Sequence, residues 1–331
     1  MAGKLIDGHG RAASYLRVSV TDRCNLLCRY CASKERTFIP HDDILRYEEI
    51  TEVIEVARRI GIDKVRFTGG EPFVRKGFAD YLEQIGARFP DLTLAVTTNA
   101  TVIGKHIDRL AVSGLSRVNI SLDTMDRDRY RHMTGRDLFD VVLENVRRCV
   151  DAGMTVKVNA VGVRGFNDDE LPAFVEFARQ NPVDVRFIEF MPIGTDTGWN
   201  ESSVWTSKDI VREAGELADL APAERGADAG PANMFAIRDG KGRIGVISPY
   251  TNHFCGTCNR LRLTSEGNLR TCLFSDKVFH LRKIIRHPTL DSGVLERVIR
   301  GALRSKPIGN DLLLARSRGG VCSTKMASIG G

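Results

Sequence analysis

The chain has 331 residues, of which 42% are hydrophobic and 27% charged, a composition typical of a globular protein with one large domain or two modest ones. No apolar run is long enough for a signal peptide or a membrane span, and the cysteines are clustered. We therefore expect a cytoplasmic protein with no membrane partner. The formal net charge of +6 would suit an anionic small molecule or a nucleic acid equally well.

Six short runs rich in β-branched residues alternate with segments that carry apolar residues at helical intervals. The helical segments include 50–60 and 141–149, and the runs span residues 16–20, 64–68, 93–98, 117–122, 155–161 and 183–190. Strands that alternate with crossover helices predict a parallel sheet. Since the chain has no dinucleotide-binding glycine fingerprint, the pattern favours an α/β fold of the partial (β/α)6 TIM-barrel type. Ligand-binding residues should then lie at the C-terminal ends of the strands.

Three cysteines, Cys24, Cys28 and Cys31, follow the first predicted strand within one stretch of eight residues. Cysteine thiolates are soft ligands, and three on one loop can converge on one metal centre. A four-iron cluster bound by three thiolates leaves one iron open to a ligand that is not protein. The alternative is a zinc knuckle or a disulfide framework, but zinc sites usually close with four ligands and nothing in the sequence indicates secretion.

Residues that follow the later predicted strands indicate a polar cavity. Gly69 and Gly70 permit close backbone approach to a ligand, and Glu71 could accept a hydrogen bond from an ammonium group. An isolated Gly-Gly-Glu-Pro is also a common tight turn. Polar residues on buried parallel strands are costly unless they face a ligand or each other. Such residues recur at the ends of the third to sixth predicted strands, in 97–99, 119–123, 157–159 and 187–192.

The periodic pattern breaks after Trp199, and residues 216–232, which are rich in Ala, Gly, Pro and Asp, predict a loop or linker. We therefore divide the chain into a barrel domain of residues 1–215 and a C-terminal region of residues 233–331. That region should open with a hairpin of strands 234–237 and 243–247.

A second cysteine group, Cys255, Cys258 and Cys272, lies in the C-terminal region. It again supplies three ligands. A zinc ribbon would need a fourth, and the remaining cysteines, Cys149 and Cys322, lie in a predicted helix and near the tail. The pattern favours a second iron–sulfur cluster with its own open iron.

Two arginines follow the second cysteine group directly. Arg260 and Arg262 would share one face of a short strand, where two guanidinium groups can bind phosphate or carboxylate. Arg17, Arg66 and Lys157 could add positive charge inside the cavity, as a triphosphate requires. A solvated charged face is the ordinary explanation for such a pair, but this pair is joined to a segment expected to bind metal.

The spacing of Cys24, Cys28 and Cys31 resembles the signature of the radical S-adenosylmethionine (SAM) superfamily, in which the open iron binds the amino and carboxylate groups of SAM. The match extends to Arg-Phe-Thr-Gly-Gly-Glu-Pro, Arg-Phe-Ile-Glu-Phe-Met, Cys-Gly-Thr-Cys-Asn-Arg-Leu-Arg and the terminal Gly330-Gly331. Over nearly its whole length the chain resembles the MoaA family of GTP 3',8-cyclases, which act in molybdenum cofactor biosynthesis. The resemblance implies two [4Fe-4S] clusters and a C-terminal double glycine that reaches back into the active site.

The resemblance also implies a role for each matching residue. Cys24, Cys28 and Cys31 would hold the SAM cluster, and the second cluster, whose open iron engages guanine, would be held by Cys255, Cys258 and Cys272. SAM would be bound by Tyr30, Gly70, Glu71, Ser121 and Met191. GTP would be bound by Arg17, Arg66, Thr97, Lys157, Arg260, Leu261 and Arg262. Catalysis would depend on Arg17, Arg260, Arg262, Gly330 and Gly331.

The implied reaction makes the chain a lyase. SAM is cleaved to L-methionine and a 5'-deoxyadenosyl radical, which abstracts the hydrogen at C3' of GTP. The ribose radical attacks C8 of guanine, giving (8S)-3',8-cyclo-7,8-dihydroguanosine 5'-triphosphate. The implied partners are an electron donor and the next pathway enzyme, cyclic pyranopterin monophosphate synthase, and the chain would be a monomer or a homodimer. One departure from the family is Thr324, with Lys325 beside it, where the family tail usually has an arginine.

Two alternatives remain at this point. A peptide-modifying radical SAM maturase would share the first loop, but it should have more C-terminal cysteines and no need for paired arginines. A metal-containing nucleic-acid-binding or redox-sensing protein would suit the basic charge. We do not expect a nucleic-acid partner, because aromatic residues are 7% of the chain and are spread out rather than arranged as stacking platforms.

Overall fold

The computed structural model describes residues 5–29, 31, 38–193, 199–224, 226, 230–315, 322, 324 and 329. Four residues discussed above, Tyr30, Lys325, Gly330 and Gly331, lie outside the described residues.

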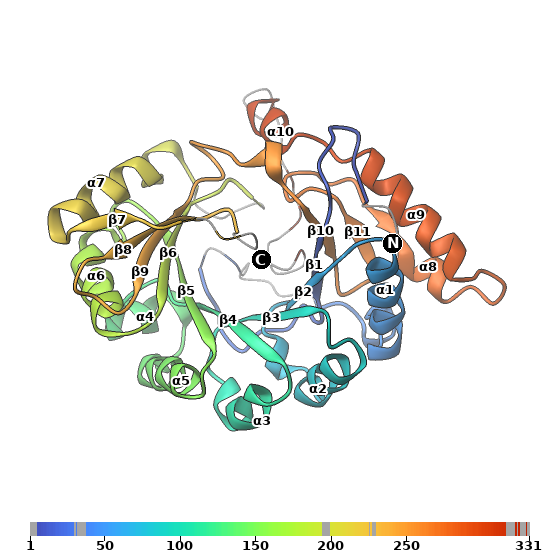
Figure 1. Ribbon diagram of the computed structural model, residues 1–331, viewed down its shortest axis with the longest axis horizontal. Coiled ribbons are helices and arrows are strands. Elements are labelled where there is room, and N and C mark those ends of the chain that lie inside the picture. The colour runs from blue at the N-terminus through green and yellow to red at the C-terminus, as the bar shows by residue number, and fades with distance from the viewer. Residues whose placement is uncertain are drawn as a thin grey trace.

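The described residues form one curved sheet with most of the helices on its outer side (Figure 1). The strand order is β12-β11-β10-β1-β2-β3-β4-β5-β6-β9-β8-β7. The strands are β1 (Tyr15–Ser19), β2 (Lys64–Thr68), β3 (Thr93–Thr98), β4 (Leu115–Ser121), β5 (Thr155–Gly162), β6 (Asp184–Glu189), β7 (Leu220–Pro222), β8 (Asn233–Ile237), β9 (Arg243–Ile247), β10 (Arg260–Leu263), β11 (Asn268–Arg270) and β12 (Phe279–His280).

The central part of the sheet is parallel, as the sequence predicted. Every neighbouring pair from β10 through β1 to β6 and on to β9 is parallel, whereas β11, β12, β8 and β7 pair antiparallel at the two margins. The bounds of β2 and β3 are those predicted, and β1, β4, β5 and β6 differ from their predictions by one or two residues at an end. The order does not return on itself, so the predicted partial barrel is confirmed.

Helices connect the parallel strands, and α1 illustrates why. Its apolar residues Ile50, Val53 and Ile54 recur at helical spacing and are buried, and the backbone N–H of Arg46 donates to Glu49 at its N-terminus (2.6 Å). The helices are α1 (Tyr47–Arg59), α2 (Phe78–Arg88), α3 (Ile107–Ala111), α4 (Arg127–Thr134), α5 (Phe139–Asp151), α6 (Leu171–Gln180), α7 (Ser207–Leu217), α8 (Leu281–Ile285), α9 (Ser292–Arg304) and α10 (Gly309–Ala315).

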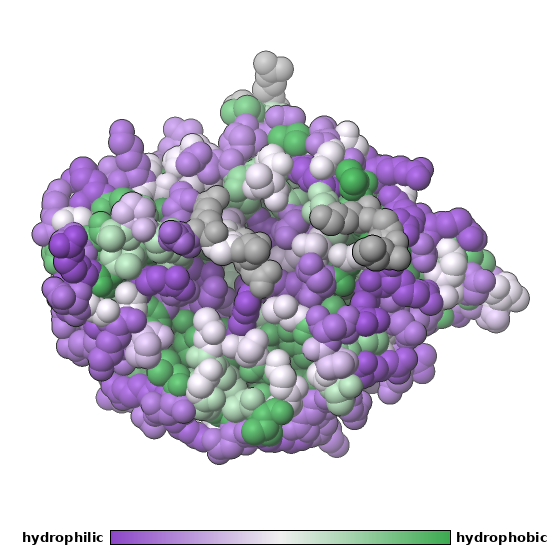
Figure 2. All heavy atoms as spheres, in the orientation of Figure 1, coloured by the Kyte–Doolittle hydropathy of each residue, from purple (hydrophilic) through white to green (hydrophobic). Residues whose placement is uncertain are grey.

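The sheet has one apolar and one polar face, because side chains alternate along each strand. On β2, Val65 and Phe67 are fully buried in the main hydrophobic core together with residues of the helices. The alternate residues, including Arg66, share the opposite face, which the helices do not cover. Figure 2 shows hydrophilic residues around the hollow near the middle of the molecule. The curved sheet therefore encloses a polar interior.

The predicted loop over residues 216–232 is corrected by the structure. Helix α7 continues to Leu217 and strand β7 occupies Leu220–Pro222, where it pairs with β8 of the hairpin. The sequence missed β7 because a three-residue edge strand that ends in proline has too few residues to display an alternation. The hairpin itself, β8 and β9, is confirmed, and β9 pairs with β6. The C-terminal region thus continues the same sheet at both margins.

A search of the described residues for a helix with the length and apolar character needed to cross a bilayer found none.

Candidate active site

The first cysteine group lies on a loop beyond the C-terminal end of β1. Backbone N–H groups of this loop donate to the end of α4: Leu27 to Thr134 (2.8 Å) and Arg29 to Met133 (3.2 Å). The N–H of Leu26 also donates to the Cys24 sulfur (3.4 Å). The loop is therefore held by backbone bonds, and its three cysteines are intermediate in burial.

The charges around the first group favour the neutral form of the Cys28 thiol. Burial, the carboxylate of Asp123 and the neighbouring thiols of Cys31 and Cys24 raise the pKa of Cys28 well above its usual range. Thiols that raise one another's pKa lie close together, and only bound positive charge stabilises all three as thiolates. Three adjacent thiols fit an iron–sulfur cluster, in which each thiolate binds a different iron.

Gly69 and Gly70 are needed for contact with the protein backbone next to this loop. A Cβ on Gly70 would overlap the carbonyl of Arg23, and one on Gly69 would overlap that of Thr21. The N–H of Gly70 donates to the carbonyl of Thr21 (2.8 Å). The glycines therefore allow the end of β2 to pack against the segment that leads into Cys24.

Glu71 is fully buried and bonded to the protein itself. Its carboxylate accepts hydrogen bonds from the Thr98 hydroxyl (2.8 Å), the Asn99 N–H (2.6 Å) and the Phe73 N–H (3.1 Å). Burial raises the pKa of Glu71 to about 7, even though these bonds oppose the shift. These three hydrogen bonds organise the ends of β2 and β3, and the contact of Glu71 with the ammonium group of SAM stays a prediction.

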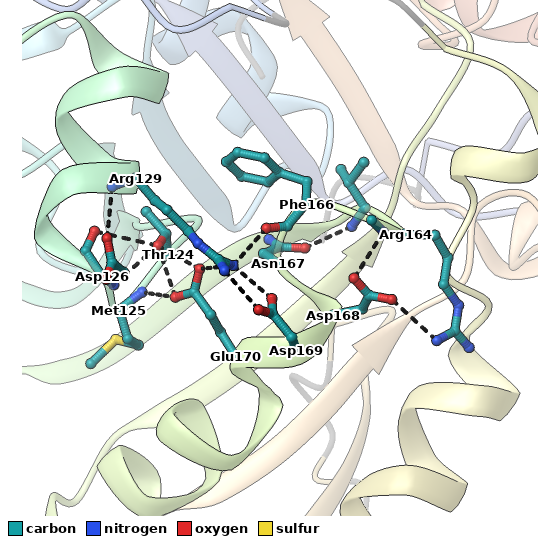
Figure 3. A network of polar contacts seen from close by, with 12 residues as sticks. Thr124, Met125, Asp126, Arg129, Arg164, Phe166, Asn167, Asp168, Asp169 and Glu170 are labelled. Atoms are coloured by element: carbon teal, nitrogen blue, oxygen red, sulfur yellow. Dashed lines mark hydrogen bonds and ion pairs between the residues drawn. The ribbon is translucent and has the colours of Figure 1, made fainter.

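A polar network fixes the loops that follow β4 and β5 (Figure 3). Glu170 accepts hydrogen bonds from the Thr124 hydroxyl (2.7 Å) and the Met125 N–H (2.6 Å). Arg129 forms a bidentate ion pair with Asp169 (2.6 and 2.7 Å). Asp123 accepts from the N–H of Val161 (2.8 Å). The network fixes the chain directly after Ser121, at the end of β4 and close to Cys28.

Basic side chains form a row across the polar face of the sheet. Strand register places Arg262 of β10 opposite Arg17 of β1, and Arg17 opposite Arg66 of β2. A second row contains Thr97, Asn119 and Lys157. The predicted polar residues therefore share one face of the sheet, which brings together residues separated by up to 245 positions in the chain.

The guanidinium groups of this row lower one another's pKa. Burial and Arg260 lower the pKa of Arg262 to about 10, and burial followed by Arg262 lowers that of Arg17 well below its usual range. Two buried polar atoms, Arg66 Nε and Thr97 Oγ1, have no hydrogen-bond partner among the described residues. Excess positive charge and unsatisfied donors fit a polyanionic ligand.

Lys157 and an arginine that the sequence analysis did not single out complete the polar face. Burial and the nearby Arg186 lower the pKa of Lys157 to about 8, although Asp184 lies 3.7 Å from its ammonium group. Arg186, on β6, donates to Asn119 (2.7 Å) and Asn159 (3.0 Å) from neighbouring strands. Its position within the Arg-Phe-Ile-Glu-Phe-Met stretch and the alternation of β6 could have indicated that it faces the cavity.

The second cysteine group lies at the other end of the same strands. Cys255 and Cys258 precede β10, which runs parallel to β1, and Cys272 follows β11, which returns antiparallel to β10. The cysteines of the first group follow the C-terminal end of β1 instead. The arginine row, in mid-strand, therefore lies between the two cysteine groups.

Gly309, at the start of α10, packs against two thiols of the second group. A Cβ there would lie 3.0 Å from the Cys272 sulfur and 3.3 Å from the Cys255 sulfur, so both face one small space. Burial opposes ionisation of Cys258, but Arg260 and Lys306 lower its pKa to about 6. Within the described part of the chain, no three His, Cys, Asp or Glu side chains converge as a single metal ion would require. An iron–sulfur cluster sets a different requirement, because each thiolate binds its own iron.

Three further sequence candidates have defined positions. The side chain of Leu261 is buried in the main core on the apolar face, so it does not face the cavity, and only its backbone could contact a ligand there. Met191 packs against a second hydrophobic cluster that includes Ile329 and Cys322. Cys149 is a buried core thiol of α5, as expected.

The described part of the tail is anchored next to the second cysteine group. The Thr324 hydroxyl accepts from Arg270 of β11 (2.9 Å) and donates to Asp276 (2.7 Å), and Ile329 is buried in the cluster that Cys272 also contacts. Gly330 and Gly331 lie outside the described residues.

The parallel partial barrel and the cysteine loop after its first strand define a radical SAM protein, and comparison with known families agrees. The model of the radical SAM superfamily matches residues 18–178, and the model described as Molybdenum Cofactor Synthesis C matches residues 183–312.

Similarity to individual proteins identifies the family within the radical SAM superfamily. GTP 3',8-cyclases of Geobacter sulfurreducens and Alkaliphilus oremlandii are each 39% identical to this chain, over 99% and 93% of its length and 100% and 94% of theirs. One from Moorella thermoacetica is 43% identical over 85% of this chain and 87% of its own. The chain therefore belongs to the GTP 3',8-cyclase family of radical SAM proteins, which disfavours the maturase and redox-sensor alternatives.

A solved structure supports the fold. SuiB of Streptococcus suis bound to S-adenosylmethionine superposes with a TM-score of 0.64 at 16% identity, covering 90% of this chain and 69% of its own.

Proposed function

We propose that this chain is a SAM-dependent GTP 3',8-cyclase, which converts GTP to (8S)-3',8-cyclo-7,8-dihydroguanosine 5'-triphosphate in the first step of molybdenum cofactor biosynthesis. The observation that carries the proposal is the position of the arginine row. Arg262, Arg17 and Arg66 lie side by side on the polar face, between one cysteine group at the C-terminal end of the strands and another at the N-terminal end.

Each part of the cavity has a task in this scheme. Cys24, Cys28 and Cys31 would hold one [4Fe-4S] cluster, and Cys255, Cys258 and Cys272 the other. When bound and reduced, the first cluster supplies the electron that cleaves SAM to methionine and a 5'-deoxyadenosyl radical.

The chain's own residues bind and orient the substrate. The guanidinium groups of Arg17, Arg66 and Arg262 donate to the triphosphate and fix the ribose, so that a single hydrogen, the one at C3', faces the radical. The Thr97 hydroxyl and the Lys157 ammonium group extend the same surface. Orientation matters because an alkyl radical reacts with most C–H bonds that it meets.

The SAM-binding residues are proposed with their positions. Ser121 is the last residue of β4, and Gly70 lies next to the cysteine loop. The roles proposed for Tyr30, Gly330 and Gly331 rest on the family resemblance. The burial of Ile329 beside the second cysteine group supports a tail that ends near this site.

The remaining assignments belong to the same proposal. A one-electron donor reduces the first cluster, and the product passes to cyclic pyranopterin monophosphate synthase, with the chain acting as a monomer or homodimer. Oxygen-sensitive clusters suit a reducing cytoplasm. Residues 1–215 would carry the SAM chemistry and residues 233–331 the second cluster, as two functional parts of one sheet.

Anaerobic turnover with GTP deuterated at C3' tests the proposal. Reconstituted protein receives SAM and a low-potential reductant, and mass spectrometry follows the label into 5'-deoxyadenosine. We expect label transfer from C3'-deuterated GTP and none from GTP deuterated at C2'. The matched Cys24→Ala protein should form no 5'-deoxyadenosine. Unlabelled 5'-deoxyadenosine as the sole product from C3'-deuterated GTP would contradict the substrate assignment.

A further inference from the structure

Lys306, in the segment between α9 and α10, is a buried lysine next to the second cysteine group. Only 2% of its surface is exposed. Its ammonium Nζ lies 3.6 Å from the Cys258 sulfur and donates to the carbonyl oxygens of Thr271 (2.9 Å) and Arg260. The sequence analysis did not single it out.

Among the described residues, this ammonium group forms no hydrogen bond or ion pair with a carboxylate. Its hydrogen bonds within this part of the chain go to two carbonyls and one sulfur. Burial of a charged ammonium group is strongly unfavourable unless an anion and hydrogen-bond acceptors compensate it. The thiolate of Cys258 is the one anionic group that it contacts within the described residues.

Each contact of Lys306 involves a segment that carries a ligand of the second cluster. Cys258 is itself a candidate ligand, Arg260 begins the strand that follows it, and Thr271 precedes Cys272. The ammonium group therefore ties β10 to the end of β11 at the point where the thiols converge.

Cys255, the third candidate ligand, is connected to Lys306 through Arg11 of the N-terminal segment. Arg11, paired with Asp7, donates to the carbonyl of Cys255 (2.8 Å) and to the carbonyls of Lys306 and Pro307 (both 3.1 Å). One guanidinium group thus connects the backbone of Lys306 to the segment of Cys255. The two cations link all three cysteine segments, although Arg11 and Lys306 are 295 residues apart.

We propose that Lys306 is a positioning residue and the buried counter-charge of the second iron–sulfur cluster, holding the three cysteine segments in place and raising the cluster's reduction potential. A cluster bound by thiolates becomes more negative on reduction, so an adjacent positive charge favours the reduced state. The proposal rests on the second cluster of the proposed function but not on GTP turnover. An experiment that measures the second cluster without GTP turnover therefore distinguishes failure of this proposal from failure of the proposed function.

The test isolates the second cluster in the full-length chain. In a protein with Cys24→Ala, Cys28→Ala and Cys31→Ala, Lys306→Met removes the charge and keeps an unbranched side chain. Lys283→Met, on the exposed surface of α8, is the matched control. After anaerobic reconstitution, iron per chain and the midpoint potential, followed by electron paramagnetic resonance, are measured.

We expect Lys306→Met to lower the equilibrium constant for one-electron reduction about tenfold, which is about 59 mV, while Lys283→Met has no effect. Loss of iron from Lys306→Met with retention in Lys306→Arg would also support the proposal, because arginine keeps the charge.

Iron content and potential equal to those of the Lys283→Met control would overturn the proposal, as would equal loss of iron from Lys306→Met and Lys306→Arg. If Lys306→Met yields no folded protein, Lys306→Arg decides. Full iron at the parental potential supports the counter-charge, and a depleted or shifted cluster refutes it.

Discussion

The two cysteine groups have the same number of thiols, but one thiol in each, Cys28 and Cys258, has neighbouring charges of opposite sign. At the first group, burial, Asp123 and the neighbouring thiols raise the pKa of Cys28. At the second group, Arg260 and Lys306 overcome burial and lower the pKa of Cys258 to about 6. The first loop is held by backbone bonds to α4, and the second group is held by buried cations.

This difference matches the two tasks proposed for the clusters. A cluster that must give an electron to SAM benefits from negative surroundings, which disfavour its reduced state and make it a stronger reductant. A cluster that lies beside a polyanionic substrate benefits from cations, which stabilise the cluster and continue into the arginine row. Similar ligand sets can thus serve different chemistry because the protein around them differs.

The largest expected effect comes from substitutions that remove one thiol from each cysteine group. Cys28→Ala should abolish formation of 5'-deoxyadenosine, whereas Cys258→Ala should retain some SAM cleavage and lose the cyclised product. Liquid chromatography with mass spectrometry quantifies both products, and iron analysis shows which cluster is lost. Formation of cyclised product by either variant would contradict the tasks proposed for the two clusters.

Removal of charge from the arginine row should weaken substrate binding without affecting SAM cleavage. For Arg66→Met we expect KM for GTP to rise about 10- to 100-fold, since a charge-assisted hydrogen bond contributes roughly 1.5–3 kcal/mol. Arg58→Met is the control, because Arg58 forms an exposed pair with Asp91 on the surface. Equal KM values in the two variants would remove Arg66 from the substrate site.

The pH dependence of GTP binding should report Lys157. Because its pKa is lowered to about 8, its positive charge disappears as the pH rises through 8. The affinity for an anionic ligand should then fall roughly tenfold between pH 7 and pH 9. Anaerobic calorimetry with GTP measures this, and Lys157→Met should flatten the profile. A wild-type profile as flat as that of the variant would exclude Lys157 as a contact.

The smallest effect concerns the loop beside the first group. The pKa of Glu71 is raised from 4.5 to about 7, so the folded state binds a proton that the unfolded state releases. The stabilisation from this group is present below pH 4.5 and is lost as the pH rises to 7. Thermal unfolding from pH 5.5 to 7.5 should therefore show a smaller decrease in Tm for Glu71→Gln than for wild type. Parallel curves would show that Glu71 is ionised throughout that range.

Local patterns in the sequence determined much of the architecture and the chemistry of this protein. Runs of five to eight residues rich in β-branched side chains were enough to locate β1 to β6, and the spacing of Cys24, Cys28 and Cys31 indicated a cluster with an open iron. The pairing of Arg260 with Arg262 also followed from alternation. These features depend on neighbouring residues, so they can be recognised without knowledge of the fold.

Contacts between distant segments were decided only by the tertiary structure. The insertion of β10 beside β1 places Arg262 next to Arg17, and packing brings Gly309, Lys306 and Arg11 to the second cysteine group. The same packing turns Glu71 towards the protein and buries Leu261 in the core. A residue's sequence neighbours do not specify which distant strand, helix end or thiol will contact it. The electrostatic difference between the two cysteine groups therefore exists only in the folded chain.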